Sequence, residues 1–277
     1  MPDGSGGAGR PAPLAEIPPA LCTGLRYLFT DIDDTVTTDG MLLDSSFGAM
    51  WRLHRAGIRV VAVTGRPAGW CDHIARMWPV AGVVGENGAF CFLYDREKRL
   101  MRRRYHPALG GAGDRAAMAK VAERVFREVP GTAFSADQAF RISDIAIDYC
   151  EDVPRLPPEK VQEICRILAE EGAQYKVSSI HVNFWKGRFD KLAGVRIFLE
   201  EDGCHDTAAA LESSLFIGDS PNDEPLFAGF PHSIAVGNLR RFLPLLTSTP
   251  ELITRADAAG GFCEAVDAIL AARARAQ

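Results

Sequence analysis

The chain has 277 residues, of which 47% are hydrophobic and 24% are charged, and its formal net charge is −5. This composition is typical of a globular protein with room for one large domain or two modest ones. The acidic balance disfavours a nucleic-acid partner, and no apolar run reaches the roughly 18 residues that a membrane span requires. We therefore expect neither a nucleic-acid partner nor a membrane partner.

Two further features concern the cell compartment and the N-terminus. Seven cysteines are scattered along the chain without a CxxC pair, which is typical of a reduced, cytoplasmic protein and not of a disulfide framework or a zinc site. Residues 1–20 are rich in Gly, Pro and Ala and contain no apolar segment of the secretory kind. We expect these residues to form a disordered tail.

Residues 21–88 alternate between apolar strand patterns and helical patterns. This alternation indicates a parallel sheet that is covered by helices on both faces. The predicted strands cover 26–32, 58–66 and the segment that begins at Val80, and the predicted helices cover 44–56 and the segment from Pro67 to about Met77.

The pattern then changes. Residues 89–105 are predicted to form a hairpin, and the segments that follow combine helical stripes with strands of alternating polarity. In the last of these strands, His181 and Asn183 share the face that could meet water or a ligand. We expect residues 89–186 to form an inserted α+β domain, and the parallel-sheet pattern returns over residues 187–277.

Polar residues directly follow the apolar strands of the predicted parallel sheet. They are Asp31, Thr64, Asn87 and Asp219. The carboxyl ends of parallel strands meet at one edge of an open sheet, and ligands bind at that edge. Asp33 and Asp223 would bring two more carboxylates there. A solvated acidic turn would explain one or two of these residues, but four acids at one edge favour a bound cation, and hard oxygen ligands suit Mg²⁺.

These residues form an ordered set that resembles the haloacid dehalogenase superfamily of phosphotransferases. The segment DIDDT (31–35) matches its first motif, Thr64 its second, Lys191 its third and GDSPND (218–223) its fourth. The long interval between Thr64 and Lys191 is similar to a C2 cap insertion, and TGR, ENGA and the α/β insert resemble the Cof-type subfamily IIB. Within it, the sequence looks most like mannosyl-3-phosphoglycerate phosphatase and sucrose-phosphate phosphatase. Two departures are Asp34 and Leu192, where many members carry Gly.

The resemblance implies an α/β fold with a Rossmann-like, haloacid dehalogenase-like core and an inserted α+β cap of the C2B type. The expected division is a tail over 1–20, core over 21–88 and 187–277, and cap over 89–186. The implied activity is Mg²⁺-dependent hydrolysis of a small phosphoric monoester, expected to be a sugar phosphate, through an aspartyl-phosphate intermediate.

The resemblance also implies a role for individual residues. Asp31 would attack phosphorus, and Asp33 would act as general acid and then as general base. Thr64 and Lys191 would contact the transferring phosphoryl group. The expected metal residues are Asp31, Asp33 through its carbonyl, Asp219, and Asp223 as an orienting residue. The expected substrate contacts are Thr64, Gly65, Arg66, Asn87, Lys191 and Asn222, with His181 and Asn183 from the cap.

Alternatives stay open at this point. Lys191 could be a surface lysine on a helix, Thr64 could cap the following helix, and Arg66 could be an exposed residue at the helix entry. The His181 face could be an ordinary solvated sheet face. A phosphomutase, or a non-catalytic protein that binds a phosphorylated ligand, would share the fold. The sequence leaves the oligomeric state open.

Overall fold

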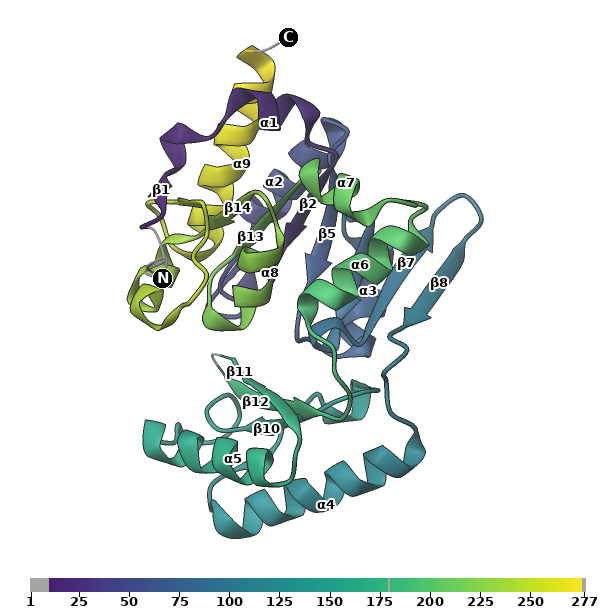
Figure 1. The fold of residues 1–277 in the computed structure, drawn as a ribbon, viewed down its shortest axis with the longest axis vertical. Helices are drawn as coiled ribbons and strands as arrows, with labels where there is room; N and C mark the ends of the chain where they lie inside the picture. The colour runs from purple at the N-terminus through teal and green to yellow at the C-terminus, as the bar shows by residue number, and fades with distance from the viewer. Residues whose placement is uncertain (1–9, 179, 276–277) are drawn as a thin grey trace, which may run out of the picture.

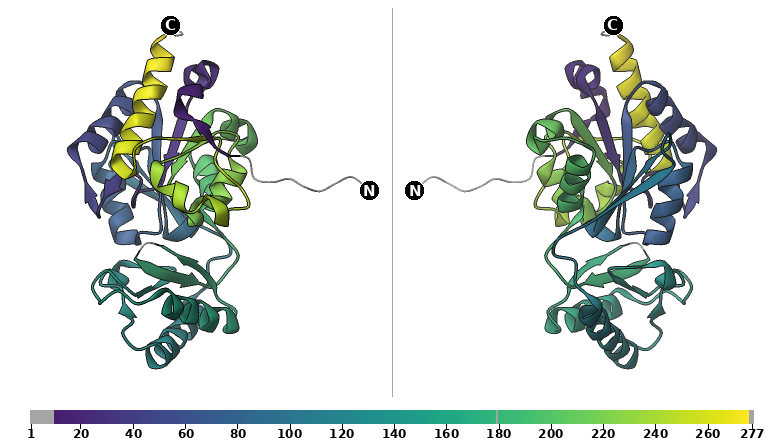
Figure 2. Two further views of the ribbon diagram at one scale, coloured as in Figure 1. Left: turned by 90° about the vertical axis from the view of Figure 1, so that its left-hand side faces the viewer. Right: turned by 90° about the vertical axis from the view of Figure 1, so that its right-hand side faces the viewer.

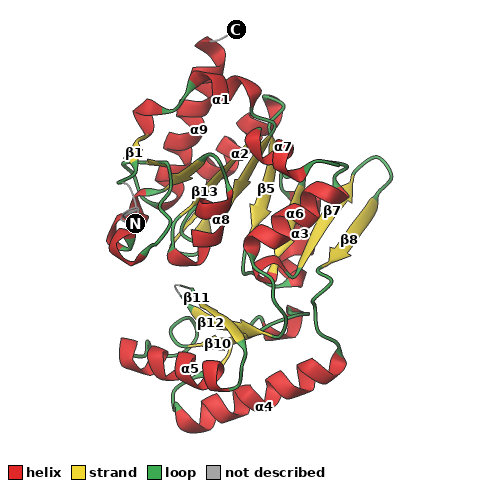
Figure 3. Ribbon diagram, viewed as in Figure 1, coloured by secondary structure: helices red, strands yellow, loops and turns green. Residues whose placement is uncertain are grey.

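The computed structural model describes residues 10–178 and 180–275, which form two large sheets (Figures 1 and 3) and a two-stranded sheet of β3 (Thr37–Thr38) and β4 (Met41–Leu42). In these residues the larger sheet has nine strands in the order β1-β15-β14-β13-β2-β5-β6-β7-β8. Neighbours from β1 to β6 are parallel, and β7 and β8 are antiparallel. The bounds are β1 (Ala12–Pro13), β15 (Leu252–Ile253), β14 (Ser233–Ala235), β13 (Ser214–Gly218), β2 (Tyr27–Thr30), β5 (Arg59–Val63), β6 (Gly82–Gly85), β7 (Phe90–Asp95) and β8 (Leu100–Tyr105).

Helices cover both faces of this sheet, as the side views show (Figure 2). Because side chains alternate along a strand, Leu28 and Val60 lie on one face and Phe29 and Val61 on the other. The first face packs on α1 (Pro19–Gly24), α2 (Asp44–Arg55), α3 (Ala68–Met77) and α9 (Ala258–Arg275). The second packs on α6 (Lys191–Glu201), α7 (Thr207–Glu212) and α8 (Glu224–Gly229). The predicted α/β core is confirmed.

The second large sheet has four antiparallel strands in the order β11-β12-β10-β9. Its strands are β9 (Ala133–Phe134), β10 (Ile145–Asp148), β11 (Gln174–Val177) and β12 (His181–Trp185). Two helices, α4 (Ala112–Glu128) and α5 (Pro158–Glu170), back the face that carries Ile147 and Phe184. The other face is turned toward the larger sheet (Figure 1). We call these four strands and two helices, with their loops, the cap.

Two connections join the cap to the core, and they lie close together. At Gly187, φ is +104°, and a Cβ atom there would lie 2.2 Å from the carbonyl oxygen of Ala108 in the other connection. Any larger residue would therefore be strained and would clash with the neighbouring connection. The glycine allows the two crossings to run side by side.

Two predicted boundaries are wrong. The hairpin that we assigned to the inserted domain extends the core sheet instead, since β7 pairs with β6 and buries Phe90 and Leu93. Residues 10–20 are not a disordered tail, because β1 pairs with β15 and both Leu14 and Ile17 are buried. The first nine residues of that predicted tail lie outside the described residues.

Two further observations bear on the environment of the protein. No helix within 10–178 or 180–275 combines the length and the apolarity that crossing a membrane requires. All seven cysteines lie in the described residues, and none of them forms a disulfide bond there.

Candidate active site

Three buried carboxylates meet at the carboxyl edge of the core sheet. Asp31 follows β2 and Asp219 follows β13, and these strands are parallel neighbours whose register pairs Thr30 with Ile217. Asp223 lies in the short turn after Asp219, where its Oδ2 accepts a hydrogen bond from the Asp219 backbone N–H at 3.1 Å. One carboxylate oxygen from each residue lies within 4.8 Å of the others. The sheet topology therefore assembles the cluster that the strand ends predicted.

Lys191 is the cation of this cluster. Its Nζ lies 2.8 Å from Asp31 Oδ1 and 2.6 Å from Asp223 Oδ1, and only 2% of the residue is exposed. It begins α6, and Asp190 caps this helix by accepting a hydrogen bond from the Ala193 N–H. The alternative of a surface lysine is therefore wrong.

The electrostatics of the cluster favour an additional cation. Burial raises the pKa of Asp31 to about 7, although Lys191 opposes this shift. Burial, and then Asp223 and Asp31, raise the pKa of Asp219 well above its usual range. Burial opposes the charge of Lys191, but the two carboxylates beside it raise its pKa overall. One lysine does not balance three buried acids, and hard oxygen ligands in this arrangement suit a divalent ion such as Mg²⁺.

Asp219 has two further partners to which the sequence analysis gave no role. Asn238 Nδ2 donates to its Oδ2 at 2.9 Å, and Thr35 Oγ1 donates to its Oδ1 at 3.4 Å. Thr35 is the last residue of the first motif, which could have indicated it. Asn238 follows β14 on the same sheet edge, and its position after an apolar strand was the available signal.

Asp33 lies beside the cluster, at the edge of the cavity, and its side chain is 31% exposed. Arg66 donates to it through Nε and Nη2. Arg66 is itself only 7% exposed, so the alternative of an exposed helix-entry residue is wrong. Its guanidinium also lies 4.4 Å from the centre of the Trp70 ring.

The structure places Thr64 behind the cavity wall. Thr64 is fully buried, and its Oγ1 accepts a hydrogen bond from the Arg66 backbone N–H at 3.0 Å. It does not cap α3, whose N-cap residue is Pro67 without a side-chain bond. In this arrangement Thr64 fixes the turn that carries Gly65 and Arg66.

A cavity of about 570 Å³ lies between the sheet edge and the cap. It brings together most of the predicted site residues. Those on its wall are Asp31, Asp33, Gly65, Arg66, Asn87, Asp219, Asn222, His181 and Asn183. Further lining residues to which the sequence analysis gave no role include Arg141, Tyr149, Arg155, Lys176 and Arg241. Charged residues on loops and strands resemble solvated faces in a sequence, so no local pattern indicated them.

Two buried nitrogen atoms on the cavity wall have no hydrogen-bond acceptor among the described residues. They are Asn87 Nδ2 and His181 Nε2. His181 Nε2 lies 2.8 Å from Glu151 Oε2 but without hydrogen-bond geometry. Burial, assisted by Arg141, lowers the pKa of His181 to about 4, so the ring is neutral near pH 7. Because unpaired buried polar atoms are costly, a bound ligand is their natural partner.

Asn183, in contrast, is engaged within the protein. Its Nδ2 donates to Asp144 Oδ2 at 2.9 Å, which places this amide in the network that holds the cap. The predicted role of Asn183 in contacting substrate remains a prediction for its other amide atom.

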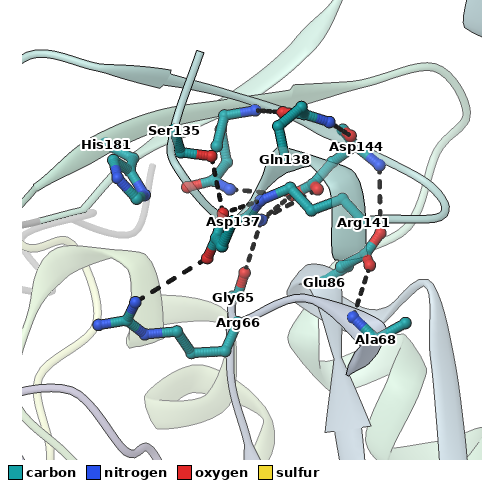
Figure 4. Close-up of polar contacts among 12 residues, drawn as sticks. Gly65, Arg66, Ala68, Glu86, Ser135, Asp137, Gln138, Arg141, Asp144 and His181 are labelled. Atoms are coloured by element: carbon teal, nitrogen blue, oxygen red, sulfur yellow. Dashed lines mark hydrogen bonds and ion pairs between the residues drawn. The ribbon is translucent and has the colours of Figure 1, made fainter. Parts of the chain in front are cut away.

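Glu86 ties the cap to the core (Figure 4). Its fully buried carboxylate accepts hydrogen bonds from the Ala68 N–H of the core at 2.9 Å, and from the N–H groups of Ile142, Ser143 and Asp144 in the cap at 3.0, 2.6 and 3.2 Å. The Ser143 hydroxyl also donates to it. Burial, and then Asp144, raise the pKa of Glu86 to about 7, while these hydrogen bonds oppose the shift.

Arg141 makes a second contact between the two domains, with its side chain reaching from the cap to the core. From the cap, its Nη1 donates to the carbonyl oxygen of Gly65 at 3.0 Å, while Asp137 and Asp144 hold its guanidinium (Figure 4). Together, the Glu86 and Arg141 contacts join the cap to the core beside the cavity that Asp31 and Arg141 both line.

Comparison with known proteins gives a consistent result. Residues 28–108 match the model of the haloacid dehalogenase-like hydrolases. None of the curated proteins matches the chain.

Solved structures match over nearly the whole chain. Protein 0175 of Thermoplasma acidophilum is 15% identical with a TM-score of 0.68, covering 89% of this chain and 98% of that one. A sugar phosphatase of subclass IIB of the superfamily is 14% identical with a TM-score of 0.62, covering 87% and 98%. The sucrose-phosphatase of Synechocystis, solved with sucrose and phosphate, is 16% identical with a TM-score of 0.58, covering 88% and 97%.

The chain has a two-part α/β architecture, a parallel-sheet core and an inserted cap, with a buried acidic cluster at the carboxyl edge of the core sheet. Residues 28–108 are similar to the haloacid dehalogenase-like hydrolases, and the fold of the chain is the one found in subclass IIB, Cof-type structures. The predicted fold is confirmed, and the match over residues 28–108 agrees with the predicted resemblance to these hydrolases.

Proposed function

We propose that the protein is a Mg²⁺-dependent phosphatase of a small phosphorylated metabolite, with sugar phosphates as the first class to test. The observation that carries this proposal is the position of Lys191 between Asp31 and Asp223, with Asp219 beside them. A protein that only binds a phosphorylated ligand has no need of a buried carboxylate paired with a lysine and next to a second, cavity-facing acid. The phosphatases among the similar structures support the same reaction class.

Mg²⁺ fits the residues that are present. The cluster offers oxygen ligands from buried carboxylates with raised pKa values, which is a poor arrangement without a cation. The ion would be held by Asp31, Asp219 and the Asp33 carbonyl, and Asp223 would orient these ligands. When bound, the ion would supply positive charge against the phosphate oxygens.

The protein residues would then act in two steps. The Asp31 carboxylate attacks phosphorus, the ester P–O bond breaks, and Asp33 gives its proton to the departing alkoxide. Water then attacks the phosphorus of the aspartyl-phosphate, Asp33 takes a proton from that water, and inorganic phosphate leaves with Asp31 restored. Lys191 favours the ionised form of Asp31 that the attack requires, because its ammonium lies 2.8 Å away.

The cavity wall would position the ester. Asn87 Nδ2 and His181 Nε2 are available to contact substrate oxygens, and His181 requires the tautomer that carries the proton on Nε2 to donate. The cap closes the cavity from the side opposite Asp31, which limits the space to a small molecule. Phosphate release from a panel of phosphorylated sugars and glycerates, with and without Mg²⁺, tests the proposal. Conversion of a sugar phosphate to its isomer, without release, would indicate a phosphomutase instead.

A further inference from the structure

We propose that the cavity binds a second anionic group of the substrate, a carboxylate or a second phosphate on the leaving group, through Arg155 and Lys176 of the cap and Arg241 of the core. This inference rests on the proposed phosphatase function, because it names the class of ester that the same cavity accepts. Phosphorylated sugar acids, phosphoglycerate-type esters and sugar bisphosphates belong to this class.

The charges on the cavity wall are divided between its two sides. All the lining carboxylates, Asp31, Asp33, Asp34 and Asp219, come from the core. Two of the lining cations are already neutralised, since Arg66 is paired with Asp33, and Arg141 is paired with Asp137 and Asp144.

The remaining lining cations are Arg155, Lys176 and Arg241. Within residues 10–178 and 180–275, no carboxylate forms a salt bridge with any of the three. These three cations come from separate segments of the chain and line the same cavity. Cations that only serve as solvated surface charges would not be expected to gather at one cavity. Their positive charge is therefore available to a ligand.

Lys176 is on the cavity side of the cap sheet. It pairs with Asn183 in the antiparallel register of β11 and β12, and directly opposed residues share one face of a sheet. Its neighbour Tyr175 packs on the opposite side, against the helices. The sheet geometry thus directs Lys176 to the same space as Asn183.

Arg155 lines the same cavity as Tyr149 and Ser178. The Tyr149 hydroxyl donates to the carbonyl oxygen of Ser178, just beyond β11, at 2.7 Å. Burial raises the pKa of Tyr149 to about 12, and the positive charge of Arg155 acts against that shift. On the core side, Arg241 lies over the ring of Phe242, which also lines the cavity, with 4.7 Å from its Cζ to the ring centre.

The phosphoryl group does not need these three cations. In the proposed reaction its charge is met at the core edge, by Lys191 and by the divalent ion. A second anion on the leaving group would be met by the cationic side of the cavity, and guanidinium and ammonium groups donate strong, charge-assisted hydrogen bonds to carboxylate and phosphate.

Matched pairs of esters test the proposal. sn-Glycerol 3-phosphate and 3-phosphoglycerate differ only in a hydroxymethyl group against a carboxylate, and glucose 6-phosphate and glucose 1,6-bisphosphate differ in a second phosphate. The measurement is the ratio of kcat/KM for the acidic to the neutral member of each pair, on the full chain with Mg²⁺. We expect a ratio well above one for at least one pair. A high ratio for the glycerol pair would indicate that the second anion is a carboxylate, and a high ratio for the glucose pair would indicate that it is a phosphate.

Single variants locate the preference. Lys176→Met and Arg155→Leu should each lower the ratio about tenfold, the effect of one charge-assisted hydrogen bond. Lys120→Met and Arg127→Leu make the same changes on α4, away from the cavity, and should leave the ratio as in the wild type. Lys176→Arg keeps the charge and should retain most of the preference, which separates charge recognition from a folding defect.

The outcomes separate the two proposals. If p-nitrophenyl phosphate and the neutral esters are hydrolysed but both ratios are near one, or if the α4 controls lower a ratio as much as the cavity variants, the second-anion proposal is overturned and the phosphatase stands. If no ester, including p-nitrophenyl phosphate, releases phosphate with Mg²⁺ present and the protein folded, both proposals fail.

Discussion

Arg66 holds Asp33 through two nitrogen atoms: its Nε lies 3.0 Å from each oxygen of the Asp33 carboxylate, and its Nη2 lies 2.8 Å from Oδ1. The same guanidinium lies 3.9 Å from Asp137 and 3.7 Å from Glu151, both in the cap. Arg66 therefore connects the proposed general acid to the position of the cap. A bidentate pair of this kind fixes orientation as well as charge.

Replacing Arg66 should impair the proton transfer that Asp33 performs. General acid catalysis contributes roughly 10²–10⁴-fold, and we expect Arg66→Met to lose about tenfold or more of it for alkyl phosphates. p-Nitrophenol needs little protonation to leave, so kcat for p-nitrophenyl phosphate should fall less. Arg76→Met is the control, because Arg76 pairs with Asp72 on the surface of α3. Equal losses for both kinds of ester would contradict this role.

Binding of Mg²⁺ should stabilise the folded protein. The buried acids around Asp219 repel one another, and a ligand that binds only the native state adds about 2.7 kcal/mol of stability at 100 times its Kd. The unfolding temperature of the wild type should therefore rise with Mg²⁺ concentration. In Asp219→Asn, which loses a proposed ligand and one buried charge, the Mg²⁺-dependent rise should be much smaller. A rise as large as in the wild type would exclude Asp219 as a ligand.

Glu86 should control how firmly the cap is attached. Glu86→Gln replaces one acceptor oxygen by a donor that faces the N–H groups of residues 142–144, and each unpaired buried group costs about 1–3 kcal/mol. We expect faster hydrogen exchange at these amides and a higher KM. Glu97→Gln, in the exposed turn between β7 and β8, is the matched control. Unchanged exchange in Glu86→Gln would show that the cap does not depend on this carboxylate.

His181 should make stability depend on pH. Burial and Arg141 lower its pKa to about 4 from an ordinary 6.5, with Arg66 acting in the same direction and Asp137 and Asp148 against it. Glu151, 2.8 Å away, faces the same ring. Because the unfolded chain binds the proton more tightly, the stabilisation is complete above pH 6.5 and is lost as the pH falls toward 4.

Chemical unfolding between pH 8 and pH 5 measures this effect. We expect the wild type to lose at most about 2 kcal/mol more than His181→Gln between pH 6.5 and 5, because unfolding takes up about one more proton over this interval. His205→Gln, at an exposed position, should follow the wild type. Parallel pH curves for the wild type and His181→Gln would contradict the lowered pKa.

The parts of the fold that follow local patterns could be predicted from the sequence. Asp31 and Asp219 were expected at one sheet edge because each follows an apolar strand, and the register of β2 and β13 confirms it. The prediction that Lys191 belongs to the site depended on the ordered motifs, because a lysine at the start of a helix does not by itself indicate a functional role.

Contacts between distant segments could not be predicted in this way. Glu86 and Ser143 are 57 positions apart, and their hydrogen bonds depend on where the cap settles on the core. Strand β7 of the hairpin pairs with β6 and so extends the core sheet. An apolar strand pattern in the sequence does not show whether such a strand joins the core sheet or a separate sheet. The pairing of β1 with β15 likewise depends on strands of two residues each, too short for a periodic pattern.

The most direct test of the account is phosphate release by the wild type and by Asp31→Asn, from phosphorylated sugars and glycerates, with Mg²⁺ and with EDTA. The account predicts release that requires Mg²⁺ and that disappears in Asp31→Asn, while circular dichroism shows that the variant is folded. Release by Asp31→Asn at the wild-type rate would contradict the assignment of Asp31 as the nucleophile, and release unaffected by EDTA would contradict the proposed metal dependence.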